Sequence, residues 1–125
     1  ATPVNYGAAD TSSIGNVASI GSSGGDPSVS NPNFTITLEG GNPNQGSILV
    51  ESASQASTST PWGTLLVGTF LRHQSFTSAT GTDSYVVPMS AGMVGQTLYF
   101  QWVIRDPGAG EIAQHSDGLS VTFCP

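Results

Sequence analysis

One segment, residues 96–106, constrains the fold of this chain more than any other. It reads Gln-Thr-Leu-Tyr-Phe-Gln-Trp-Val-Ile-Arg-Asp and is followed by the turn residues Pro107 and Gly108 and by a second alternating segment, 118–123. β-Branched and aromatic residues bounded by chain breakers are typical of β-strands. Because no segment of the chain predicts a convincing helix, we expect an all-β chain.

Turn residues separate further alternating segments along the rest of the chain. The stretch 52–60 fits either a loop or an edge strand, and Pro88 marks an edge or a strand end because it cannot donate a ladder hydrogen bond. Seven or eight short strands spaced by turns predict a two-sheet antiparallel β-sandwich. Besides the two segments above, strands are expected at 34–38, 47–51, 64–77 (broken near Gly68), 84–89 and 111–115.

We predict that residues 1–30 form a Gly/Ser-rich N-terminal arm and that residues 31–125 form the sandwich domain. Glycines interrupt a helix-like apolar spacing in the arm, which leaves a short strand or turn at 16–20. The arm either packs on its own domain or adds a strand to a neighbouring copy. In the second alternative the residues of the assembly arm are Val4, Tyr6, Ile14, Val17 and Ile20.

Strand alternation also predicts the core. Burying a large apolar side chain contributes about 1.5–3 kcal/mol, so Phe100 and Trp102 are expected to be structural anchors. Tyr99, Gln101 and Val103 should point the opposite way. The side chains expected to face inward are Phe34, Ile36, Leu38, Ile48, Val50, Leu65, Val67, Tyr85, Val87, Leu98, Phe100, Trp102, Ile104, Leu119, Val121 and Phe123.

The charge composition excludes some classes of partner. Only 8% of the residues are charged, lysine is absent, and Arg72 and Arg105 are the only Lys or Arg residues in a chain of formal charge −6. Such a chain has no basic stripe for nucleic acid and no attraction to anionic lipid. No apolar run reaches the roughly 20 residues that span a bilayer, so we expect no membrane insertion.

Secretion is the expected localisation, at or outside the cell surface. Polarity comes mainly from Ser, Thr, Asn, Gln and Gly, and the chain begins with Ala1 rather than methionine. This start suits a mature chain from which a secretion signal has been removed.

Two residues of the chain invite covalent modification. Cys124 is the only cysteine, so it forms an intermolecular disulfide or acts as a small apolar residue that closes the last strand. Asn33 begins an Asn-Phe-Thr sequon, which predicts glycosylation in an exported protein.

Glycan binding is a separate prediction. Trp62, in a Pro-Trp-Gly turn, and the outward Tyr99 are candidate glycan contacts. The alternative for Trp62 is that it plugs one end of the sandwich.

Catalytic and metal-binding patterns are weak. Residues 21–25 match the serine-hydrolase string Gly-x-Ser-x-Gly but lack the strand and helix that this motif requires. His73 and His115 have no neighbouring ligands at metal-site spacing. Asp106 with Glu111 or Asp117 matches no calcium loop. We therefore expect no catalytic residues, no metal and no cofactor, and a protein that is not an enzyme.

Three stretches of the chain carry a resemblance to a known domain: 31–38, 63–67, and 94–108 together with 117–123. The resemblance is to an uncharacterised domain that recurs in secreted proteins of planctomycetes and similar bacteria. It spans about residues 29–123 and implies an exported all-β module with no known enzymatic activity. Members often have additional cysteines that this chain lacks.

Taken together, these features predict a secreted structural protein that assembles with copies of itself into a fibre, sheath or matrix. Low charge weakens repulsion between copies, and an extended arm can extend a neighbour's sheet. The alternative is a carbohydrate-binding or adhesive extracellular module.

Overall fold

The computed structural model describes residues 3–60, 63–68, 70–107 and 113–125. Ten strands and one short 3-10 helix lie within these residues, which confirms the all-β prediction. The elements are β1 (Val4–Tyr6), β2 (Ser19–Ser23), β3 (Thr35–Glu39), β4 (Gly46–Ser52), β5 (Gln55–Thr60), β6 (Gly63–Val67), β7 (Phe70–Phe76), β8 (Asp83–Val86), η1 (Ala91–Met93), β9 (Thr97–Arg105) and β10 (Ala113–Thr122).

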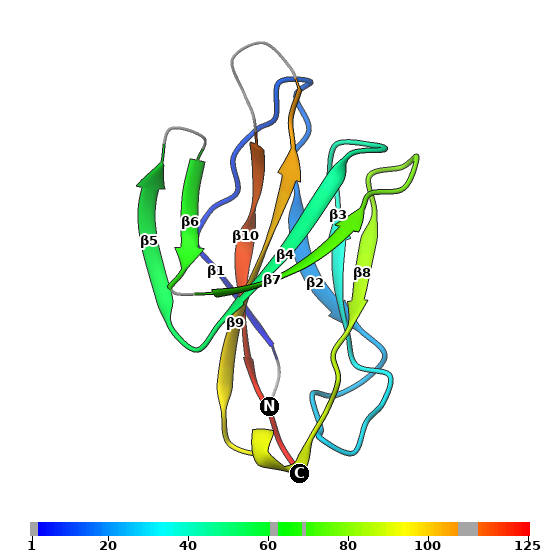
Figure 1. Cartoon of the computed structure of the whole chain (residues 1–125), viewed down its shortest axis with the longest axis vertical. Helices are drawn as coiled ribbons and strands as arrows, with labels where there is room; N and C mark the ends of the chain where they lie inside the picture. The colour runs from blue at the N-terminus through cyan, green and yellow to red at the C-terminus, as the bar shows by residue number, and fades with distance from the viewer. Residues whose placement is uncertain (1–2, 61–62, 69, 108–112) are drawn as a thin grey trace.

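The strands form a sandwich of two antiparallel sheets with an added hairpin (Figure 1). The larger sheet has the order β1-β10-β9-β4-β7, and the smaller has the order β2-β3-β8. The hairpin β5-β6 is a separate two-stranded sheet. In the part of the chain that the structure describes, no helix is long and apolar enough to cross a membrane.

The main core lies between the five-stranded and three-stranded sheets. Trp102 is fully buried there, and its indole Nε1 donates a hydrogen bond of 3.0 Å to the carbonyl oxygen of Thr37, joining the two sheets. A buried indole N–H normally needs such a partner. The buried core cluster consists of Ala18, Ile20, Phe34, Ile36, Leu38, Leu49, Val87, Phe100, Trp102, Ile104, Leu119, Val121 and Phe123.

The number of strands differs from the seven or eight expected, because the arm contributes β1 and β2 and the stretch 52–60 contains β5. Two expected strands, 111–115 and 118–123, are joined in β10. Its register with β9 shifts between His115 and Gly118, as at a β-bulge. Ser116 sits in this bulge, and its hydroxyl accepts a hydrogen bond from the Trp102 amide.

The predicted inward face of β4 was wrong. Leu49 belongs to the core cluster, whereas Ile48 and Val50 lie on the opposite face of the sheet. Three consecutive apolar residues, 48–50, contain no alternation that could distinguish the two faces. Val50 is nevertheless buried, because the β5-β6 hairpin covers part of this outer face.

The hairpin layer also changes the roles of Leu65, Val67 and Gln101. Leu65 and Val67 lie on the hairpin rather than in the main core cluster. Gln101 points away from that core, as predicted, but is fully buried beneath β6. Its Oε1 accepts a hydrogen bond from the Leu66 amide, and its Nε2 donates to the carbonyl oxygens of Thr64 and Ser116.

The N-terminal arm packs on its own domain in this single chain. β1 pairs with β10, and β2 pairs with β3, so the arm supplies one edge strand to each sheet. The Asp117 carboxylate accepts hydrogen bonds from the Asn5 side chain and the Ile20 amide, which ties both arm strands to β10. Donation of the arm to a neighbour stays a prediction and would require these strands to be exchanged between copies.

Candidate functional site

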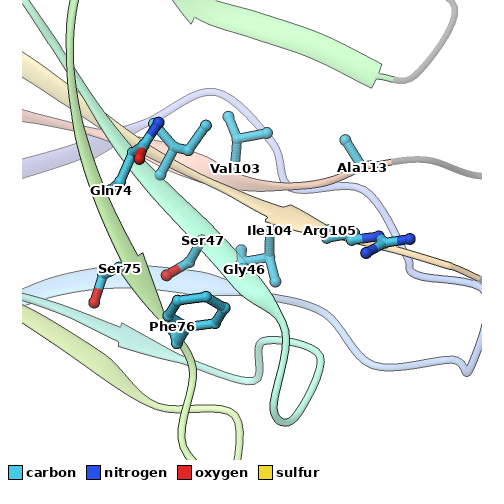
Figure 2. A pocket seen from close by; sticks show the side chains of 10 residues that line it. Gly46, Ser47, Gln74, Ser75, Phe76, Val103, Ile104, Arg105 and Ala113 are labelled. Atoms are coloured by element: carbon cyan, nitrogen blue, oxygen red, sulfur yellow. The ribbon is translucent and has the colours of Figure 1, made fainter.

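A surface depression of the described chain lies on the outer face of the five-stranded sheet. It comprises two adjoining pockets of about 610 and 310 Å³ that share Ile48 and Val103, and we call it the outer groove. Figure 2 shows Gln74 and Phe76 on β7 at one side and Val103, Arg105 and Ala113 on β9 and β10 at the other. The smaller pocket adds Val50, Thr60, Leu65, Arg72 and His115 to the groove.

Strand alternation positions the floor of the groove. Trp102 and Ile104 point into the core, so Val103 and Arg105, between and beyond them on β9, point outward. Ile48 pairs with Val103 on one side and with Gln74 on the other, which makes a cross-strand row. The floor is therefore aliphatic at its centre.

Phe76 forms the rim of the groove on β7, the edge strand of the five-stranded sheet. Its side chain is 76% exposed, and Leu71 on the same strand is 64% exposed. Edge strands are usually protected from pairing by charge, proline or a bulge. β7 contains no proline, and Arg72 is its one Lys or Arg residue, so large apolar side chains at this edge stand beside a single arginine.

The groove also collects positive charge. Both arginines of the chain, Arg72 and Arg105, line it although the formal charge of the whole chain is −6. Arg105 is exposed, and among the described residues its guanidinium has no ion pair. An apolar floor beside a cation suits a ligand that combines apolar and acidic groups.

His115 closes one side of the groove and is itself mostly buried. Its Nδ1 lies 3.2 Å from Oδ2 of Asp10, and its amide donates a 2.7 Å hydrogen bond to the other carboxylate oxygen. These contacts fix the arm beside β10. The second histidine, His73, is paired with Glu51 at 2.9 Å and stacks on Tyr85, away from the groove.

The five predicted arm residues do not gather in one place. Ile20 belongs to the core, and Tyr6 is half-buried, with its hydroxyl donating to the Leu66 carbonyl oxygen at 2.7 Å. Val4, Ile14 and Val17 are exposed. Burial, with a smaller contribution from Tyr99, raises the pKa of Tyr6 to about 12.

Of the two predicted glycan contacts, Tyr99 and Trp62, the structure describes only Tyr99. Tyr99 is half-buried and meets Tyr6 edge-on, with ring centroids 5.9 Å apart. Trp62 lies outside the described residues, so its prediction stays open.

The two predicted modification sites are both at least partly accessible. Asn33 is exposed. Cys124 is half-buried, and its backbone forms an isolated parallel β-bridge with Ser28. Glycosylation and intermolecular disulfide formation stay predictions.

Several candidate ligands of a metal ion are used in internal contacts. Asp106 is buried and accepts hydrogen bonds from the amide and the hydroxyl of Ser13, whereas Asp117 holds the arm. Glu111 lies outside the described residues. Among those described, no group of three or more His, Cys, Asp or Glu side chains is arranged to hold a metal ion.

The outer groove was not predicted from the sequence, although the sequence does indicate some of the outward-facing residues that line it. The only two arginines, Arg72 and Arg105, stand at outward positions of strands, and Val103 was predicted to face outward. The missing step was the pairing of β4 between β7 and β9, which brings these residues onto one face.

Comparison with family models, with curated proteins and with solved structures found no match. The resemblance to the secreted planctomycete domain therefore stays a prediction.

Proposed function

We propose that this protein is a secreted structural module that self-associates at the cell surface and that the outer groove is its principal contact surface. One feature supports this function most directly: Phe76 is exposed at the rim of an aliphatic groove on an open edge strand. Contiguous apolar surface of this kind on soluble proteins is typical of interaction sites.

The charge of the chain supports contact between copies. A low density of charged side chains gives weak long-range repulsion, even at a formal charge of −6. Placing both arginines in the groove makes this surface the complement of the remaining, acidic surface. A second copy therefore presents the kind of charge that the groove attracts.

The groove carries this function better than donation of the arm does. Ile20 is 4% exposed and belongs to the main core, so releasing β2 to a neighbour would open the sandwich. Deleting the arm would remove part of the core as well as any assembly contact. Point substitutions in the groove separate these two effects.

The carbohydrate-binding alternative depends on an accessible aromatic pair. Tyr99 is engaged with Tyr6, and the exposed aromatic side chain of the groove is Phe76, on an aliphatic floor. Sugar sites need polar groups that can bond to hydroxyls, whereas the centre of this floor is formed by Ile48 and Val103. The groove chemistry favours a protein partner.

Sedimentation velocity over a concentration series, with electron microscopy of the same samples, tests the proposed function. The wild-type chain should form oligomers or filaments, and Phe76→Ser should shift it toward monomer. The matched control is Val86→Ser, which removes another exposed apolar side chain, on β8 of the other sheet. A wild-type chain that is monomeric at all accessible concentrations would contradict the proposal.

A further inference from the structure

The acidic residues of this chain are unequally available for contact with a partner. Asp10, Glu51, Asp83, Asp106 and Asp117 all accept hydrogen bonds or form ion pairs within the chain.

Only two of the described carboxylates remain available. The side chains of Asp26 and Glu39 are exposed, and among the described residues they have no hydrogen bond or ion pair. They are therefore the acids that the described surface offers to a partner.

Glu39 is followed by Gly40, which lies against the backbone of the exposed apolar residue Val17, whereas Asp26 lies in a Ser/Gly-rich loop. β2 and β3 pair Ser19 with Glu39, and the backbone of Val17 packs against Gly40, the next residue after Glu39. Val17 is 52% exposed. We call these two side chains, Val17 and Glu39, the acidic patch.

Glu39 of the acidic patch and Arg105 of the outer groove point away from opposite faces of the sandwich, although Phe76 at the groove rim also lines a second pocket, of about 620 Å³, with Glu39. Leu38 points into the core from β3, so its neighbour Glu39 points away from the five-stranded sheet. On the other side Ile104 points into the core from β9, so Arg105 points away from the three-stranded sheet. The side chains of Glu39 and Arg105 therefore point in opposite directions.

We infer that the acidic patch of one copy docks in the outer groove of the next copy, with Glu39 paired to Arg105 and Val17 on the aliphatic floor. This inference rests on the proposed function and names its partner surface. Two different surfaces meet in such a contact, so the interface is heterologous. Because Glu39 and Arg105 point in opposite directions on one molecule, repeated docking adds copies in a line and favours an open filament over a closed dimer.

Charge reversal tests this contact, with association measured by sedimentation velocity and filaments counted by electron microscopy. Arg105→Glu and Glu39→Arg should each lower the association constant roughly tenfold or more, because like charges then meet. An equimolar mixture of the two variants should assemble again, since every groove then meets a patch of opposite charge. The control is Asp26→Arg, which should assemble like the wild type.

The outcomes separate the inference from the proposed function. If the wild type assembles and both single reversals assemble equally well, the inference is overturned while self-association stands. An equal loss with Asp26→Arg, or a mixture that stays monomeric, also overturns it. Circular dichroism should show unchanged strand content, because both substituted side chains are exposed.

Discussion

Replacing Gln101 with methionine should destabilise the protein far more than its polar character suggests. The side chain is fully buried between β9 and the hairpin and makes hydrogen bonds of 3.0, 3.0 and 2.9 Å to Leu66, Thr64 and Ser116. Methionine fills a similar volume, so Gln101→Met removes the hydrogen bonds while keeping most of the packing.

The expected magnitude follows from the groups that lose their partner. A buried donor or acceptor without a partner costs about 1–3 kcal/mol. The Leu66 N–H loses its acceptor entirely, whereas the carbonyl oxygens of Thr64 and Ser116 each lose one donor. We expect the free energy of unfolding to fall by about 2–4 kcal/mol, a large part of the roughly 5–15 kcal/mol typical of a domain.

Urea unfolding followed by tryptophan fluorescence measures this change, and amide exchange at Leu66 locates it. The control is Gln96→Met, at an exposed glutamine outside the outer groove, which should change stability by no more than about 0.5 kcal/mol. If the Gln101 variant and the control unfold with equal midpoints and slopes, Gln101 is not buried beneath the hairpin. That result would refute the placement of the β5-β6 hairpin on the outer face of the sheet.

Three further outcomes are expected. Gly81→Ala should cost at least about 2 kcal/mol in urea unfolding, because φ is +75° and the added Cβ would lie 2.0 Å from a backbone oxygen; Gly92→Ala, with open space around it, is the control. The raised pKa of Tyr6, about 12, means that the stability it contributes is complete below pH 10 and is lost as the pH rises toward 12. Tyr6→Phe should flatten that alkaline loss and, without the bond to Leu66, cost about 1 kcal/mol at neutral pH. In material from an exporting, glycosylating host, intact mass should exceed that of the bare chain by a glycan, and Asn33→Gln should abolish the difference; a bare-chain mass from the wild type would refute the glycosylation prediction.

Local pattern was sufficient where one face of a strand is polar. In β3 the alternation of Ile36 and Leu38 with threonines predicted the inward face, and both side chains are buried. The inward face of β9 was also predicted correctly for Phe100 and Trp102, although its opposite face is not wholly polar and includes the buried Gln101. Strands such as β3 specify their own orientation, because a slip of one residue would bury polar groups and expose apolar ones.

The candidate site could not be predicted in the same way, because it is built by strand order. β4 lies between β7 and β9, strands that are far apart in the sequence. This order brings Phe76, Ile48 and Arg105 onto one face. The acidic patch has the same origin, since the pairing of β2 with β3 places Ser19 opposite Glu39 and the backbone of Val17 lies against Gly40.

The amino-acid sequence by itself determined that the chain is built of β-strands, where most of them run and which side chains of the alternating strands are buried. It did so because strand periodicity and turn chemistry act between near neighbours. The tertiary structure alone decided that the arm is shared between both sheets and that a hairpin covers the outer face. It also made Arg105 and Glu39 point in opposite directions, because pairings between distant strands depend on the packing of the whole chain.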